Sequence, residues 1–292
     1  MRITIRVLAS GSSGNALFLR AGETRILVDA GIPAARIERG LAELGESADA
    51  LDAVLLTHEH ADHVRGLGGL LAPRPELRVL ATAGTRRALE SARGDLGKSG
   101  LRPAWGAALV AARGVDLGQL RLRPFPLPHD AAEPVGFRFE AGDRAIGLAT
   151  DLGSSTPVVE RSLAGCSVLI LEANHDLDLL ARGPYPVFLK RRVASHQGHL
   201  SNAQAASLLQ RLAGPALRHV VLAHLSRTNN RPDAALRTVA PALADCRDLQ
   251  LSVGRPQAPG EPIELLAGPA AAAEPGSMPT TEGLPRQLGL FD

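Results

Sequence analysis

The chain has 292 residues, of which 45% are hydrophobic and 3% aromatic, and its net charge is +2 at pH 7. This length suits one large domain whose core is built mainly from Leu, Val and Ala, and the small charge permits a nucleic-acid partner without requiring one. No run of 18 apolar residues is present, which excludes a membrane-spanning helix, and two distant cysteines without a CxxC spacing argue against a disulfide framework.

The N-terminal stretch MRITIRVLAS alternates apolar and polar residues, which is typical of a strand and unlike a signal peptide. We therefore expect a cytoplasmic protein without a membrane partner. Further along the chain, apolar periodicity predicts strands at Ile3 to Ala9, Thr24 to Asp29, Ala53 to Thr57, Leu77 to Ala81, Leu120 to Leu127, Val135 to Ala141, Arg144 to Ala149, Val168 to Glu172, Val220 to Ala223, Leu249 to Val253 and Ile263 to Leu266. Helices are predicted at Pro33 to Leu44, Thr85 to Arg93, Thr156 to Leu163, Tyr185 to Val193, Asn202 to Leu212 and Asp233 to Leu243.

This alternation of strands and helices, with antiparallel runs in the middle, predicts one α/β domain over residues 1–266. Residues 267–286 are dominated by Ala, Pro, Gly, Glu and Thr without periodicity, which predicts a disordered linker. Residues 287–292, Gln-Leu-Gly-Leu-Phe-Asp, form an apolar tip on that linker. The sequence Ser201-Asn202-Ala203-Gln204 is a capping-box pattern that opens one helix.

The strongest chemical signal is His58-Glu59-His60-Ala61-Asp62-His63, directly after a buried strand. Four potential metal ligands lie within six residues, and imidazole combined with carboxylate suits Zn²⁺, Mn²⁺ or Fe. Glu59 and Ala61 are expected to face away from the metal. A polar loop with solvated histidines is the simpler alternative, but it does not account for four ligand-type side chains at this spacing.

The motif resembles the signature of the metallo-β-lactamase-fold hydrolases, and further ligand-type residues end later strands in the family's order. The resemblance implies an α/β fold in a four-layer αββα sandwich without a β-CASP insertion. It also implies a first divalent metal ion on His58, His60 and His129, and a second on Asp62, His63 and His224, with Asp151 bridging both. The metals would be Zn²⁺ or Mn²⁺, with Fe possible, and a bridging hydroxide would attack the substrate. Asp29 would orient a ligand histidine.

Four secondary motifs, SGSSGN, LEANHD, GHLSN and HLSRTNN, resemble the YycJ/WalJ-type branch of that family. That resemblance implies a bacterial 5′–3′ exonuclease acting on DNA in repair or replication. Asp62, Asp151 and His199 are the catalytic candidates, with His199 placed to protonate a leaving oxygen or to hold a phosphate. Candidates for orienting ligands or contacting substrate are Ser12, Ser13, Asn15, His175, Ser201 and Asn202.

Three basic residues, Lys190-Arg191-Arg192, precede GHLSN and would either bind backbone phosphate or form a solvated helix face. His196 and His219 match no family position and are expected at the surface. Other substrates stay open: RNA, a cyclic nucleotide, or a small thioester or ester. A regulatory metal-binding protein linked to cell-wall control is the alternative from another class.

The C-terminal Gln-Leu-Gly-Leu-Phe resembles the peptide by which bacterial proteins bind the β sliding clamp. Leu288, Leu290 and Phe291 would fill apolar pockets while Gln287 forms a hydrogen bond at the rim. Gly289 departs from the usual Ser or Asp and adds backbone freedom that binding must remove, at a cost of up to ~1 kcal/mol. Packing of the tail on its own domain and a chance match are the alternatives.

Deletion of Gln287 to Asp292 is expected to abolish capture of the protein by immobilised β clamp, because it removes every anchoring side chain. Turnover of free DNA ends should be unchanged. A lower melting temperature of the deletion variant, with clamp capture retained, would instead indicate that the tail packs on its own domain.

Overall fold

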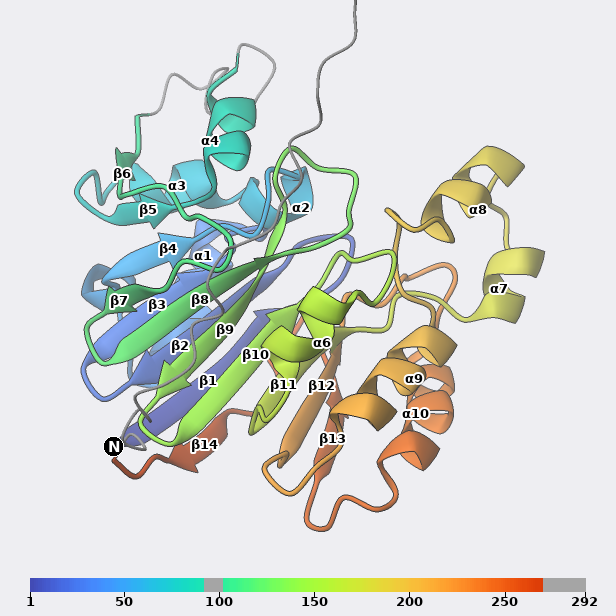
Figure 1. The fold of residues 1–292 in the computed structure, drawn as a ribbon. Coiled ribbons are helices and arrows are strands. Elements are labelled where there is room, and N and C mark those ends of the chain that lie inside the picture. Colours follow the sequence, from blue (N-terminus) through green and yellow to red (C-terminus); the bar gives the residue numbers. More distant parts are fainter. Residues whose placement is uncertain (92–101, 270–292) are drawn as a thin grey trace, which may run out of the picture.

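Two seven-stranded sheets pack face to face in the computed structural model, which describes residues 1–91 and 102–269 (Figure 1). The first sheet has the order β14 (Ile263–Leu266), β1 (Arg2–Ala9), β2 (Ala16–Ala21), β3 (Thr24–Val28), β4 (Ala53–Leu55), β5 (Arg78–Leu80) and β6 (Ala104–Trp105). The second has the order β13 (Gln250–Val253), β12 (His219–Ala223), β11 (Val168–Glu172), β10 (Arg144–Ala149), β9 (Val135–Ala141), β8 (Leu120–Pro126) and β7 (Val115–Leu117).

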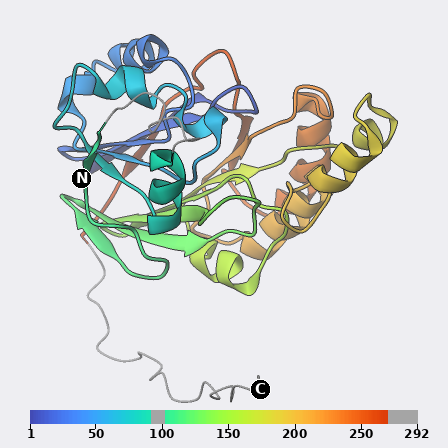
Figure 2. The same cartoon turned by 90° about the horizontal axis from the view of Figure 1, so that it is seen from above.

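Helices cover the outer face of each sheet (Figures 1 and 2). The first sheet carries α1 (Ala34–Ala42), η1 (Ala48–Ala50), α3 (Leu67–Leu71) and α4 (Ala83–Glu90), and the short α2 (Ala61–Val64) lies at its edge. The second carries α6 (Pro157–Leu163), α9 (Asn202–Leu212), α10 (Pro232–Val239) and η2 (Ala240–Leu243). The predicted four-layer α/β sandwich is therefore confirmed.

The layers follow from which face of each strand is apolar. In β1, Ile3, Ile5 and Val7 enter the core between the sheets, while Leu8 enters the core beneath α1 and α3. β11 is buried along its whole length, as expected of a strand covered on both faces. Its side chains alternate between the core between the sheets and the core beneath α6 and α9, so one strand holds two layers together.

The polar ends of parallel strands meet at one edge of the sandwich. β3 is parallel to β4 in the first sheet, and β10, β11 and β12 are mutually parallel neighbours in the second. Asp29 and His224 directly follow β3 and β12, Asp151 lies two residues after the end of β10, and the three have φ of 59°, 54° and 62°. This left-handed conformation is unfavourable for residues with a Cβ atom and concentrates at functional sites.

Several predicted boundaries hold to the residue: Val135–Ala141, Arg144–Ala149, Val168–Glu172, Asn202–Leu212 and Ile263–Leu266. The predicted helix from Asp233 to Leu243 is wrong over its last turn, because Pro241 lacks the N–H that an α-helix needs and the chain continues as the 3₁₀ helix η2. The helix predicted from Tyr185 begins at Val187, after Pro186. The predicted end at Arg93 lies outside the described residues, and α4 runs from Ala83 to Glu90.

Some elements were not predicted at all: β2, β6, β7, α2, α3 and the helix α7 (Leu177–Arg182). β2 is almost entirely buried and so lacks an apolar-polar alternation, and α3 contains two glycines that lower its helix propensity. Within residues 1–91 and 102–269, every named strand belongs to one of the two sheets, so no inserted β-CASP-like domain is found there. Nor does this part of the chain contain a helix long and apolar enough to cross a membrane.

β14 ends at Leu266, and Ala267 N then donates a hydrogen bond to Met1 O at 2.8 Å. The domain end at residue 266 stays a prediction. Residues 270–286 of the predicted linker and the predicted clamp-binding peptide 287–292 lie outside the described residues.

Phe137 packs beside Phe139 in the core between the sheets, and both side chains are fully buried. Phe137→Ala should lower the free energy of unfolding by about 3–5 kcal/mol, because it leaves a cavity that neither sheet can close. Urea denaturation measures this loss. Val110→Ala, at a half-exposed position, is the control and should change stability by less than about 0.5 kcal/mol. Equal effects of the two substitutions would contradict the assignment of this core.

Candidate metal centre

Nine ligand-type side chains converge where the strand ends of the two sheets meet. Within the described residues they fall into four overlapping groups, each with its ligand atoms within 4.8 Å of one another. The groups are His58, His60 and His129; His58, His63 and Asp151; Asp62, His63 and His224; and Asp151, Glu172, His199 and His224. All seven predicted ligands are among these nine residues, and Asp151 belongs to two groups.

Three of the five predicted ligand histidines have a hydrogen-bond acceptor close to the ring atom Nδ1. The Nδ1 atom of His63 lies 2.7 Å from Asp29 Oδ2, and that of His224 lies 3.0 Å from Glu172 Oε1. His129 Nδ1 is 3.1 Å from Gly198 O. Because a donor at Nδ1 leaves Nε2 as the free lone pair, these contacts favour the tautomer that can bind a metal through Nε2.

Asp29 fixes the start of the metal loop as well as one of its rings. Its Oδ1 accepts a hydrogen bond from Thr57 N at 2.9 Å, and Thr57 Oγ1 lies 3.0 Å from Asp29 Oδ2. The same hydroxyl is 3.0 Å from His58 Nδ1. The carboxylate therefore orients His63 directly and His58 through Thr57. That Asp29 orients a metal ligand stays a prediction, which these contacts support.

Asp151 is a buried carboxylate surrounded by histidines. Its Oδ2 is 3.1 Å from His63 Nε2, and its Oδ1 is 3.5 Å from His224 Nδ1 and 3.9 Å from His129 Nε2. Burial alone would raise the pKa of this carboxyl, but the facing His224 and His63 hold the pKa well below its usual range. The side chain therefore stays ionised in the interior, as a bridging metal ligand must.

Among the nine ligand-type side chains, two buried atoms have no hydrogen-bond partner in the described part of the chain, His58 Nε2 and Asp151 Oδ2. Buried polar atoms are rarely left unpaired, and metal coordination is one way to satisfy them. Imidazole nitrogens and carboxylate oxygens are ligands of Zn²⁺, Mn²⁺ and Fe. The residues thus fit a divalent metal centre.

Glu172 is a site residue that the sequence alone does not reveal. It lies among Asp151, His199 and His224, the ligand-type residues at the second sheet. Its Oε1 accepts from His199 Nδ1 at 2.7 Å and from His224 Nδ1 at 3.0 Å, and its Oε2 accepts from the amides of Leu152 and Leu200. Burial opposes ionisation, but His199 and His224 lower the pKa of this carboxyl to about 2. A sequence signal for its role is its position at the end of the apolar strand Val168–Glu172, because a charged residue in a buried strand requires partners.

His199 lies beside the candidate ligand histidines His129 and His224, and its side chain remains 22% exposed. Its ring is 5.3 Å from that of His224 and 5.2 Å from that of His129, centroid to centroid. Burial works against protonation, but the Glu172 carboxylate raises the pKa of His199 above its usual value. With Nδ1 fixed on Glu172, Nε2 is the ring atom left to exchange a proton.

The SGSSGN loop reaches the site through its ends. Asn15 Oδ1 accepts from Gly11 N at 2.8 Å, and Asn15 Nδ2 lies 3.0 Å from His63 Nε2 and 3.3 Å from Asp62 O. Ser10, which was not predicted, accepts from His224 N through Oγ at 2.7 Å. By contrast Ser12 is exposed and Ser13 half-buried, and no side-chain contact of either with the metal ligands is found within the described residues.

The remaining candidates lie outside the four ligand groups. Ser201 forms the predicted capping box with Gln204, and Asn202 exchanges two amide hydrogen bonds with Asn230, at 3.0 and 2.8 Å. His175 is buried beside Ser201 but belongs to none of the ligand groups. Glu59 faces away as predicted, with Oε1 accepting from Ala132 N at 2.7 Å.

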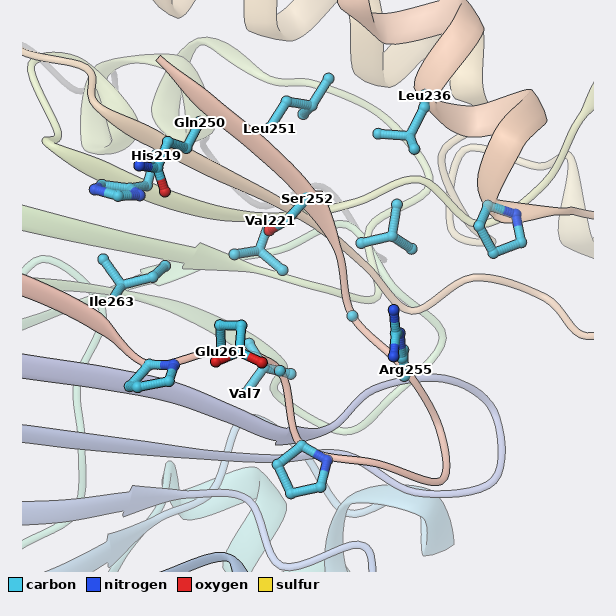
Figure 3. A pocket seen from close by; sticks show the side chains of 16 residues that line it. Val7, His219, Val221, Leu236, Gln250, Leu251, Ser252, Arg255, Glu261 and Ile263 are labelled. Atoms are coloured by element: carbon cyan, nitrogen blue, oxygen red, sulfur yellow. The ribbon is translucent and has the colours of Figure 1, made fainter. Parts of the chain in front are cut away.

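His196 is exposed, as predicted. The surface position predicted for His219 is wrong in detail, because this first residue of β12 is half-buried and its burial lowers the pKa of the ring. It lines a cavity of about 490 Å³ between the edge strands β13 and β14, where the two sheets part (Figure 3). None of the candidate metal ligands lines this cavity, so it is separate from the metal centre.

Comparison with known proteins identifies a family for this arrangement. A family model described as "Beta-lactamase superfamily domain" matches residues 24–225. The chain is 33% identical over 246 residues to Exodeoxyribonuclease YycJ of Bacillus anthracis, covering 84% of the chain and 90% of that protein. It is 34% identical over 247 residues to Exodeoxyribonuclease WalJ of Streptococcus pneumoniae, covering 85% and 90%. The fold is similar to that of the metallo-beta-lactamase fold protein YhfI from Bacillus subtilis, with a TM-score of 0.68, 16% identity, and 90% and 100% of the two chains covered.

Asp29→Asn should weaken metal binding by about 10- to 100-fold, because the amide cannot replace the charge that orients His63 and Thr57. Titration of the metal-free protein with Zn²⁺ or Mn²⁺ by calorimetry measures the affinity. His196→Ala, at an exposed histidine, is the control and should bind as the wild type does. An unchanged affinity in Asp29→Asn would show that the carboxylate does not support the metal ligands.

Proposed function

Because the chain belongs to the beta-lactamase superfamily, in its metallo-β-lactamase-fold YycJ/WalJ branch, and is a metal-dependent hydrolase, we propose that it is a two-metal phosphodiesterase that degrades DNA as a 5′–3′ exonuclease. The observation that carries this proposal is the buried Asp151 carboxylate, which lies between His129 of the first predicted ligand set and His63 of the second. Similarity to proteins described as exodeoxyribonucleases supports the choice of DNA as the substrate.

In this proposal His58, His60 and His129 would hold one divalent ion, Asp62, His63 and His224 the other, and Asp151 both. The ions, Zn²⁺ or Mn²⁺, would lower the pKa of water and neutralise charge on the phosphate oxygens. Binding requires the deprotonated ring nitrogens, so it would release protons from the site.

The chain's own groups would then place the substrate and transfer the proton. His199 Nε2 is the donor to the leaving oxygen, with Nδ1 held at 2.7 Å by Glu172 Oε1. Glu172 also orients His224, so one carboxylate aligns a candidate proton donor and a candidate metal ligand. Its hydrogen bond from Leu152 N further links it to the turn that carries Asp151.

We assign the C-terminal peptide Gln287 to Asp292 to the β sliding clamp, which would bring the nuclease to newly replicated DNA in repair or replication in the cytoplasm. This assignment rests on the sequence of the peptide alone.

Asp151→Ala should lower the rate on end-labelled DNA by at least about 100-fold, because the site loses the carboxylate that would bridge two cations. The assay compares 5′- and 3′-labelled DNA, single-stranded and duplex, with matched RNA, in Mn²⁺ and in Zn²⁺. The wild type should release nucleotides from the 5′ end of DNA. Asp116→Ala, at an exposed carboxylate of β7, is the control and should behave as the wild type does.

Equal inactivity of the wild type and Asp151→Ala on both DNA and RNA would contradict the nuclease proposal and favour a regulatory metal-binding protein. Cleavage of RNA alone would show that the substrate is RNA and not DNA.

A further inference from the structure

Helices α7 and α8 (Val187–Val193) form an arm that projects beyond the outer helices of the second sheet (Figure 1). In the view from above, the same yellow segment lies at one end of the molecule (Figure 2). α7 is anchored by the buried Leu180, but α8 has no buried residue. Short helices owe their stability to packing of an apolar face, so an α8 that exposes apolar residues calls for a partner.

The exposed face of α8 combines an aromatic ring with cations. Phe188 is 73% exposed and Val187 63% exposed. Arg191 and Arg192 follow each of them by one turn and are also exposed, while Leu189, Lys190 and Val193 on the other side are partly buried. One face of α8 therefore presents Val187, Phe188, Arg191 and Arg192.

The basic residues of the arm differ in what they already bind. Arg192 forms an ion pair with Asp130, with Nη2 2.6 Å from Oδ2, and Lys190 Nζ donates to Ala181 O at 2.6 Å. For Arg191 and for Arg182 of α7, no ion pair or side-chain hydrogen bond is found in the described part of the chain. Two guanidinium groups are thus available to an anionic partner.

The arm is joined directly to the candidate metal centre. Val193 O accepts a hydrogen bond from His199 N at 2.9 Å, and Asp130, the partner of Arg192, follows His129. Asp130 N donates to Gln197 O at 3.1 Å, which fastens the segment after α8 to the same loop. Phe188 lies five residues before Val193 in the helix, or about 7.5 Å along its axis. These contacts place the face of α8 near the candidate metal centre, within reach of a strand bound there.

We propose that the exposed face of α8 is a binding platform for single-stranded nucleic acid, in which Phe188 stacks on a base and Arg191 contacts the backbone phosphate. Aromatic stacking combined with a cationic track is the usual chemistry of sequence-independent single-strand binding. A second copy of this chain is a poorer occupant, because a symmetric contact through this face would bring like-charged arginines together. This proposal rests on the proposed nuclease function and adds the form of substrate that the enzyme holds.

The test compares kcat/KM of the full-length, metal-loaded enzyme on a short single-stranded oligodeoxynucleotide and on a small chromogenic phosphodiester that cannot reach the arm. Phe188→Ala should lower kcat/KM about tenfold or more on the oligonucleotide and leave the small diester unchanged. Phe188→Trp should retain activity on the oligonucleotide, because any large aromatic ring can stack. Leu266→Ala, at an equally exposed apolar residue on β14, is the matched control and should affect neither substrate.

Salt dependence tests the cation separately. In Arg191→Ala the slope of log(kcat/KM) against log salt on the oligonucleotide should become shallower by about 0.7, the value for one lost phosphate contact on a single strand. Arg191→Lys should keep the slope of the wild type.

Equal losses on both substrates, or no loss with Phe188→Ala, would overturn the platform while leaving the nuclease proposal intact. A wild type that cleaves the small diester but neither DNA nor RNA would overturn the nuclease proposal, and the platform with it. A change in oligomeric state on Phe188→Ala, measured by light scattering, would show that the face contacts a second copy and would also overturn the platform.

Discussion

Three buried carboxylates, Asp29, Asp151 and Glu172, are the constraint on which the site depends. Each is at most 3% exposed, and an ionised carboxylate in the interior is tolerated only when charges and donors compensate it. Asp29 and Glu172 are compensated by histidine rings together with backbone or hydroxyl donors. Asp151 faces histidines, and its Oδ2 makes no hydrogen bond within the described residues although His63 Nε2 lies 3.1 Å away, so a cation would complete its compensation.

The same constraint explains why the site lies between the sheets. Asp29, His58 and His63 follow strands of the first sheet, whereas Asp151, Glu172 and His224 belong to strand ends of the second. Ser10 from the first sheet accepts a hydrogen bond from the His224 amide, across 214 residues of sequence. The cluster therefore forms only when the two sheets pack, and the left-handed turns at Asp29, Asp151 and His224 are the local cost of directing side chains inward.

The sequence revealed the candidate ligands, which the fold brings together, better than the residues that position them. Ligand residues carry a local pattern, either the His58 to His63 motif or a polar residue that ends an apolar strand, and this pattern can be read without the fold. Glu172 and Ser10 act on residues far away in the chain, so nothing beside them in the sequence reveals the role. The exposed position of Phe188 was also hidden, because its neighbours Val187 and Leu189 give the segment the apolar character of a packed helix. Pro241 and Pro186 set helix limits that apolar periodicity alone did not predict.

The central proposal is that the buried Asp151 carboxylate would join two cation sites. Anomalous diffraction from crystals of the protein loaded with Mn²⁺ tests it most directly. Two anomalous peaks per chain are expected, one at His58, His60 and His129 and one at Asp62, His63 and His224, with Asp151 in contact with both. A single peak, or peaks that leave Asp151 without a metal contact, would contradict the account.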